Sequence, residues 1–73
     1  MNDGINKVLN KIADIFDDMS LGIMGDIDGV DFLRGYLTAL KESGEITNSD
    51  RIYLMKFYKR LIEDKIVLRR EEE

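Results

Sequence analysis

The segment from residue 50 to residue 68 has the apolar pattern of an α-helix that needs more than one neighbour. Its large apolar side chains recur at three- and four-residue steps, which places them on one side of a helix. They are Leu54, Met55, Phe57, Tyr58, Leu61, Ile62 and Leu68. On a helical wheel they span close to half of the circumference, whereas packing against one helix needs a stripe of about 100° or slightly more. We therefore expect this helix to contact two or more surfaces, some of which a second chain can supply.

Two further segments have helical spacing and predict helices over about residues 5–19 and 30–43. The apolar stripe of the first consists of Ile5, Val8, Leu9, Ile12, Ile15, Phe16 and Met19. For the second, Asp28 is the expected N-cap and Gly44 the expected left-handed C-terminal stop. Gly35 lies inside this helix, where glycine is unfavourable, which suggests a close helix crossing. The chain has no proline, and this favours uninterrupted helices.

The two connections differ in length. Residues 20–29 contain three glycines, and we expect the apolar side chains at 21, 23 and 24 to fold back onto the core. The second link, residues 44–47, is short enough to make the second and third helices neighbours, most simply as an antiparallel hairpin. Thr47 and Asp50 form a capping-box-like pair, with Asn48 as the alternative cap. The third helix is expected from about residue 48 to 65, and residues 66–70 are compatible with either helix or strand.

The sequence therefore predicts an all-α fold with residues 1–73 as a single domain. It is a three-helix bundle in which the second and third helices form an antiparallel hairpin and which dimerisation can complete. A domain of this size buries only about 60% of its unfolded surface, so a lone core is marginal. The absence of cysteine and histidine removes disulfides, zinc and haem as sources of extra stability. Self-association remains available, and we expect a homodimer and no cofactor.

Three aspartates between residues 26 and 31 resemble part of a calcium-binding loop but fail its spacing. With Asp26 as the first ligand of an EF-hand, Val30 occupies the fifth position and Asp31 replaces the required glycine. Leu37 occupies position twelve, where a glutamate is needed. We expect no metal site here, only helix capping and a solvated turn.

A second acidic group, formed by Asp14, Asp17 and Asp18, lies opposite the apolar stripe of the first helix. Catalytic carboxylates normally occupy a cleft that perturbs their pKa values, whereas a solvated helix face perturbs them little. A small helical domain without histidine or cysteine has few catalytic options. We expect no catalytic residue and no enzymatic activity.

Charge is unevenly distributed along the chain, whose net charge is −4. Residues 51–70 carry seven basic and two acidic side chains. Within this part, residues 57–70 resemble the end of a winged-helix recognition helix followed by its first wing strand. That resemblance implies DNA contacts by Lys59, Arg60, Arg69 and Arg70, and Lys56 lies on the same basic side of the helix. The turn position that is usually glycine in that family is Lys65 here. An acidic protein is a poor general binder of nucleic acid, so DNA binding is the second hypothesis.

The first hypothesis is a small non-enzymatic interaction or regulatory protein that binds a larger protein or a second copy of itself through broad apolar helix faces. The expected partner-binding residues are Phe32, Tyr36, Tyr53, Phe57, Tyr58 and Leu61. Tyr53 differs from the others because the helical wheel places it away from the apolar face. No apolar stretch is long enough to span a membrane and no secretion signal is present, so we expect a cytoplasmic protein. Size and acidity suit a bacterial or phage accessory protein.

Overall fold

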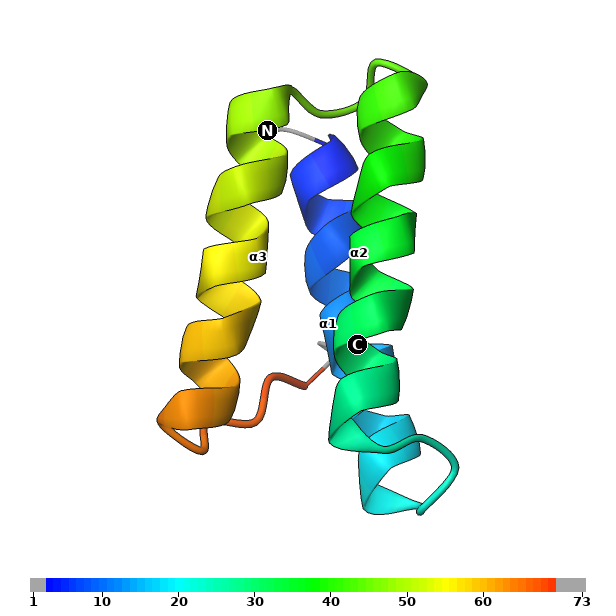
Figure 1. Cartoon of the computed structure of the whole chain (residues 1–73), viewed down its shortest axis with the longest axis vertical. Helices are drawn as coiled ribbons and strands as arrows, with labels where there is room; N and C mark the ends of the chain where they lie inside the picture. Colours follow the sequence, from blue (N-terminus) through cyan, green and yellow to red (C-terminus); the bar gives the residue numbers. More distant parts are fainter. Residues whose placement is uncertain (1–2, 70–73) are drawn as a thin grey trace.

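The structure is a computed structural model that describes residues 3–69 and contains three α-helices (Figure 1). They are α1 (Asp3–Ser20), α2 (Asp26–Glu42) and α3 (Asn48–Glu63). Residues 3–69 include no β-strand. The radius of gyration of 11.9 Å is close to the value of about 11 Å expected for a folded domain of this length. The predicted all-α, three-helix fold is confirmed.

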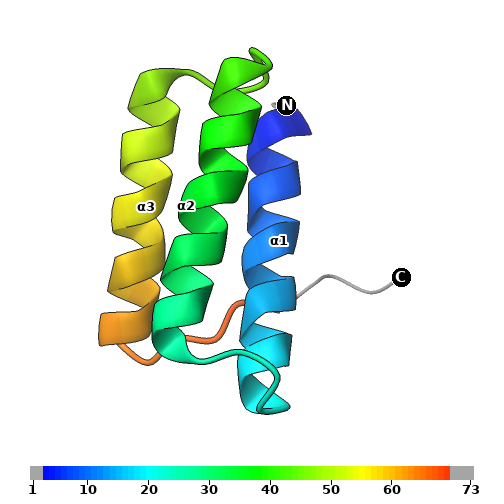
Figure 2. The ribbon, with the colours of Figure 1, turned by 45° about the vertical axis from the view of Figure 1, so that its right-hand side comes forward.

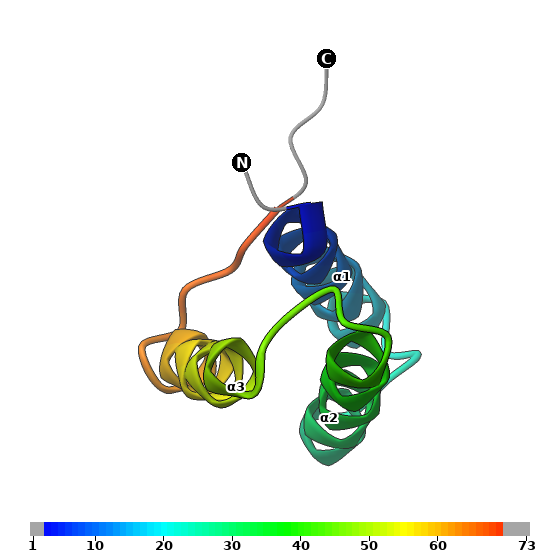
Figure 3. The ribbon, with the colours of Figure 1, turned by 90° about the horizontal axis from the view of Figure 1, so that it is seen from above.

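The three helices lie side by side, with α2 packed against both of its neighbours in the sequence (Figures 1 and 2). Seen from above, their axes occupy the corners of a triangle (Figure 3). The link between α2 and α3 lies at the end of the bundle where α1 begins, and the link between α1 and α2 lies at the opposite end. After α3, residues 64–69 cross from α3 towards α1 (Figure 3). The final described segment therefore closes the side of the bundle that faces away from α2.

The helix α2 begins four residues earlier than the apolar periodicity predicted. Its N-cap is Gly25, and the carboxylate of Asp28 accepts a hydrogen bond from the Gly25 amide at 3.4 Å. Asp28 is therefore the third residue of the helix and caps it from inside, so its prediction as the N-cap is wrong. The error arises because aspartate is favourable at both positions and the buried periodic residues begin only after the first turn.

The helix α3 begins as predicted, with Thr47 as its N-cap. The Asp50 amide donates to the Thr47 hydroxyl, and the Thr47 amide donates to the Asp50 carboxylate, each at 3.0 Å. This reciprocal capping box satisfies two amides that a helix start leaves without partners. Gly44 has a φ of +82°, which confirms it as the left-handed stop after α2.

The end of α3 differs from both alternatives left open by the sequence. The helix finishes at Glu63, and Lys65 adopts a left-handed φ of 57°. The Ile66 amide then donates to the carbonyl of Leu61 at 2.9 Å, which closes the helix end. Residues 66–69 are neither helix nor strand. A non-glycine residue with positive φ reverses the chain direction here and sends the segment back across the bundle.

A single core fills the space between the helices. It consists of Val8, Ile12, Ile15, Phe16, Leu33, Leu37, Leu40, Ile46, Leu54, Met55, Tyr58 and Leu61. The Tyr58 ring stacks on Phe16 with a centroid separation of 5.7 Å and an interplanar angle of 16°. Of the seven apolar residues on the third-helix face, four are buried in this core and three are partly buried. One copy of the chain therefore covers most of the face that the sequence suggested would need a partner.

The close helix approach predicted at Gly35 occurs elsewhere. A Cβ atom built on Gly35 has nothing within 4 Å. A Cβ atom on Gly29 would lie 2.7 Å from the Tyr58 hydroxyl and 3.1 Å from the Cγ2 atom of Ile15. Gly29, and not Gly35, is the position in α2 where the absence of a side chain lets the helices approach.

Candidate interaction site at one end of the bundle

The six residues predicted to bind a partner are not all accessible. Tyr58 is fully buried and Leu61 is 6% exposed, because both lie at the centre of the α3 stripe that packs on α1 and α2. Tyr58 is therefore not accessible to a partner in this fold, and Leu61 is accessible only where it lines the cavity described below. Tyr53 is 67% exposed, as expected from its place on the helical wheel, and Phe57 is half-buried.

The two aromatic residues predicted on α2 are partly covered by a lysine from α1. The Lys11 ammonium lies 5.6 Å from the centre of the Phe32 ring and 5.2 Å from that of Tyr36. These distances are typical of cation–π contacts. Phe32 remains 45% exposed, and Tyr36 is half-buried. The pair therefore contributes to contact between α1 and α2 and offers a partner only the edges left uncovered.

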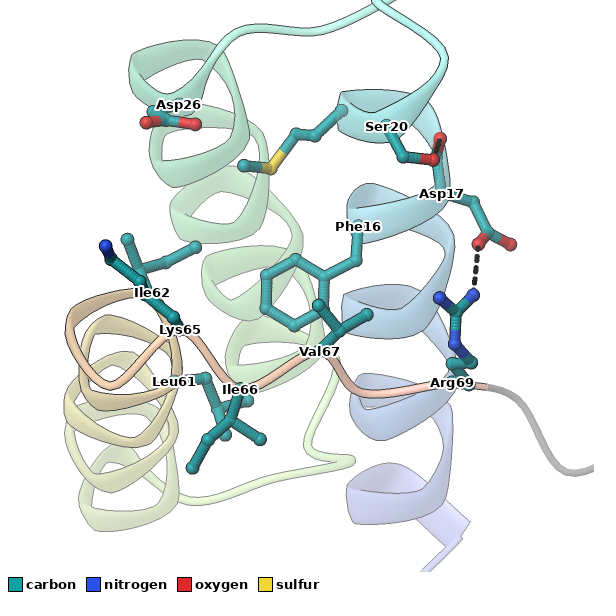
Figure 4. Close-up of a pocket in the computed structure, with 11 residues that line it drawn as sticks. Phe16, Asp17, Ser20, Asp26, Leu61, Ile62, Lys65, Ile66, Val67 and Arg69 are labelled. Atoms are coloured by element: carbon teal, nitrogen blue, oxygen red, sulfur yellow. Dashed lines mark hydrogen bonds and ion pairs between the residues drawn. The ribbon is translucent and has the colours of Figure 1, made fainter.

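The predicted basic contacts do not form one surface. Lys56, Lys59 and Arg60 are exposed on α3, and Arg60 pairs with Asp64 at 3.1 Å. Arg69 instead lies against α1, where it pairs with Asp17 at 4.0 Å (Figure 4). Arg70 lies outside the described residues. The wing strand implied by the winged-helix resemblance is absent from residues 66–69, because the left-handed turn redirects this segment across the bundle.

Exposed apolar side chains gather at the end of the bundle where α1 ends and α2 begins. Leu21, Ile23 and Ile27 are 72%, 70% and 78% exposed, and we call these three residues the aliphatic corner. Ile66 and Val67, also exposed, line a cavity together with Ser20 and Asp26, the residues on either side of the connection between α1 and α2. Among residues 3–69, these are five of the eight large apolar side chains that are exposed. Their concentration at one end distinguishes it from scattered surface apolar residues, which are common.

The backbone holds the aliphatic corner in a defined turn. The amide of Leu21 donates to the carbonyl of Asp17 at 3.0 Å, and the amide of Ile23 donates to the carbonyl of Asp18 at 2.9 Å. Between them, Gly22 has a φ of +76°, a conformation that glycine adopts without strain. These bonds use carbonyl groups that the end of α1 would otherwise leave without partners. The turn therefore presents its aliphatic side chains outward from a hydrogen-bonded backbone.

At the same end of the bundle lies a cavity of about 490 Å³, which we call the end cavity (Figure 4). Its apolar lining comes from the end of α1, the end of α3 and the segment that follows α3. These residues are Phe16, Met19, Leu61, Ile62, Ile66 and Val67. Four charged side chains also line it: Asp17, Asp26, Lys65 and Arg69. Its volume is in the range of pockets that hold small ligands or a large side chain of a partner.

Among residues 3–69, the ionisable groups with clearly shifted pKa values are not part of the lining of this cavity. A hydrogen bond and ion pair join Lys7 to Glu45 near the other end of the bundle, raising the pKa of the lysine and lowering that of the carboxyl group. Burial, and secondarily the charge of Asp26, raises the pKa of the Tyr58 phenol, which donates to the Met19 sulfur at 3.7 Å. The end cavity thus offers apolar contact with charges of both signs around it.

Sequence reasoning did not identify this site because it expected the connection between α1 and α2 to pack on the core. Met24 does pack there, but Leu21 and Ile23 point away from it. A usable signal was present in the charge pattern, since residues 12–33 contain six aspartates and no lysine or arginine. Apolar residues that follow no helical period inside such an acidic stretch are candidates for an exposed contact surface.

Among residues 3–69, no three acidic side chains come together in an arrangement able to hold a metal ion. None of the helices in the same part of the chain combines the length and apolarity needed to cross a membrane. Comparison of the chain with protein-family models, curated proteins and solved structures finds no match.

Proposed function

We propose that this chain is a small non-enzymatic interaction or regulatory protein that binds another protein through the end cavity and the aliphatic corner. The observation that carries the proposal is that exposed aliphatic side chains and an apolar cavity occur at the same end of the bundle. Exposing Leu21, Ile23 and Ile27 to water is unfavourable, and a partner that covers them gains about 25 cal/mol for each Å² of apolar surface removed from water.

In this proposal the rest of the fold is a scaffold. The α2–α3 antiparallel hairpin and the helix α1 packed against it supply the core, which fixes the ends of all three helices. A cavity next to fixed apolar side chains suits the usual anatomy of a protein interface, in which a pocket receives one large anchoring side chain. Dimerisation is the competing form of the same proposal, with a second copy as the partner.

Site-specific photo-crosslinking in cells of the source organism tests this function. A photoreactive residue at Ile23 is expected to give a discrete adduct, whereas the same residue at Ile52, an exposed isoleucine of α3, is the matched control. Adding Leu21→Ser and Ile27→Ser to the Ile23 variant should abolish that adduct. Equal adducts at both positions, or none at Ile23, would refute the proposal. An adduct at twice the chain mass of 8.5 kDa would assign the surface to self-association.

DNA binding through α3 is a second candidate, because Lys56, Lys59 and Arg60 are exposed on this helix. Phosphate contacts by such residues make affinity fall steeply as salt concentration rises. The test is the salt dependence of binding to duplex DNA, compared between the unmodified chain and the Lys56→Ala/Lys59→Ala double variant. Binding that is weak at low salt, or that does not change in the double variant, would exclude this role for α3.

A further inference from the structure

The end of the bundle that carries the aliphatic corner is also strongly acidic. Six aspartates lie on the second half of α1 and the first half of α2: Asp14, Asp17, Asp18, Asp26, Asp28 and Asp31. Two of them contact an arginine, since Asp17 pairs with Arg69 and Asp31 with Arg34 at 3.2 Å. The lining of the end cavity itself has two acidic and two basic side chains, so the excess of negative charge at this end comes from the other aspartates of α1 and α2. A partner that docks at this end therefore meets a negative surface potential.

The negative charge narrows the kinds of partner that can bind, because the apolar surface alone does not distinguish between them. A second copy bound by the same surface would bring the six aspartates of both chains together, and like charges across an interface are unfavourable. Nucleic acid and anionic lipid are repelled for the same reason. Charge complementarity therefore favours a cationic segment of a different protein.

The apolar part of the surface defines the rest of the partner. The end cavity, at about 490 Å³, has room for one large apolar side chain of the partner. The aliphatic corner, at the same end of the bundle, offers the partner further exposed apolar surface. A helix with apolar residues at three- and four-residue steps can place one side chain in a cavity and the next ones on its flank. Basic residues on the borders of that helix face would then lie against the aspartates.

We propose, on the basis of the function given above, that the end cavity and the aliphatic corner bind a cationic amphipathic helical segment of another protein. Lys or Arg side chains of this segment contact the carboxylates of Asp18 and Asp26, while an apolar side chain enters the end cavity. Asp26 lines the cavity itself. Asp18 lies in the last turn of α1, and its carbonyl accepts the amide of Ile23, which places it beside the aliphatic corner.

Three synthetic helical peptides of about 18 residues, five helical turns, provide the probe. The first combines an apolar face with lysine and arginine on its polar face, the second has the same apolar face with glutamate, and the third has the basic composition in scrambled order. Fluorescence anisotropy with the full chain should show the first peptide binding at least about tenfold more tightly than either of the others. Binding should weaken as salt is raised towards physiological ionic strength.

Variants of the chain locate the binding. Leu21→Ser/Ile23→Ser should reduce affinity for the basic peptide at least about tenfold, whereas Ile52→Ser, at an exposed isoleucine of α3, should leave it unchanged. Asp18→Asn/Asp26→Asn should reduce it roughly threefold to tenfold, and Glu42→Gln at the far end of α2 is the matched control. Circular dichroism verifies that each variant keeps its helical content.

The outcomes separate the two proposals. The proposal of a cationic partner would be overturned if the basic and glutamate peptides bound equally well. It would also be overturned if Asp18→Asn/Asp26→Asn and Glu42→Gln had equal effects on affinity. Neither result would contradict a crosslink specific to Ile23, which tests the proposed function. Basic peptides that bind regardless of sequence order would also overturn the proposal of a cationic partner, because the apolar face would then play no part. Absence of a position-specific crosslink together with absence of peptide binding would remove both proposals.

Discussion

Gly29 is the position where one added methyl group should reveal how closely the helices pack. Replacing it with alanine creates a Cβ atom 2.7 Å from the Tyr58 hydroxyl and 3.1 Å from the Ile15 methyl group. Both distances are shorter than the 3.5–4.0 Å at which non-bonded heavy atoms pack best. Tyr58 is fully buried and stacked on Phe16, so its ring has little space in which to retreat. The strain must therefore be absorbed by movement of α2 or α3.

The size of the effect follows from two opposing terms. Alanine is favoured over glycine in a helix by up to about 1 kcal/mol, whereas forcing a methyl group into a packed core costs about 1–3 kcal/mol. We expect Gly29→Ala to lower the free energy of unfolding by up to about 2 kcal/mol. Gly35→Ala, in the same helix with nothing within 4 Å, should raise it by about 0.5–1 kcal/mol. For a domain of this size, each 1 kcal/mol corresponds to a shift of about 4–8 °C in Tm.

Urea denaturation followed by circular dichroism measures both variants, and Tyr58→Phe completes a double-mutant cycle. Because the phenol oxygen is the nearest atom to the new methyl group, Gly29→Ala should be less destabilising in the Tyr58→Phe background by about 1 kcal/mol. Equal stabilisation by Gly29→Ala and Gly35→Ala would refute the close approach. A coupling energy of zero would show that the phenol is not the obstacle.

Three further predictions concern the helix ends. Because its contact with Lys7 lowers the pKa of Glu45, this carboxyl group stabilises the fold above its ordinary pKa of 4.5 and loses that contribution as pH falls through the lower folded value. Glu45→Gln should therefore reduce the loss of unfolding free energy that accompanies a fall in pH below about 4.5. If this loss is the same in the variant, the ion pair of Lys7 with Glu45 does not contribute to stability. Gly44→Ala should lower the free energy of unfolding by about 1 kcal/mol, since its φ is +82°, a conformation that strains residues with a Cβ atom; a neutral result in urea titrations would argue against this backbone. Thr47→Ala should cost about 1 kcal/mol through loss of the N-cap, whereas Thr47→Ser should be nearly neutral; equal losses would exclude the capping role.

The secondary structure was largely predictable because it depends on local patterns. The capping pair of Thr47 and Asp50 and the left-handed Gly44 are read from residue type and spacing alone. The start of α2 was misplaced because its first turn carries Ile27 outward, so the apolar periodicity gives no signal there. The end of α3 was not predictable from propensity, since it depends on the left-handed conformation of Lys65, a residue with no special preference for it.

The candidate site was less predictable because it depends on which apolar residues the tertiary fold leaves uncovered. Tyr58 and Leu61 belong to a broad helical face, and the breadth of a face does not say which of its members a neighbour covers. Residue 29 was assigned to the connection before the second helix, so Gly35 was the only crossing point that the sequence suggested; Gly29 was identified only once the helices were placed in space. Ile66 and Val67 come to line the end cavity only because the chain reverses after α3.

The packing of α2 against both of its neighbours in the sequence also bears on how fast the chain acquires its structure. Each helix pair is joined by a connection of only a few residues, so forming either pair closes a short loop with a small loss of chain entropy. Domains dominated by such local contacts have low contact order and typically fold in microseconds to milliseconds. Either of these two helix pairs can act as the nucleus onto which the remaining helix docks. The chain contains no proline, so we expect rapid refolding without a slow phase from proline isomerisation.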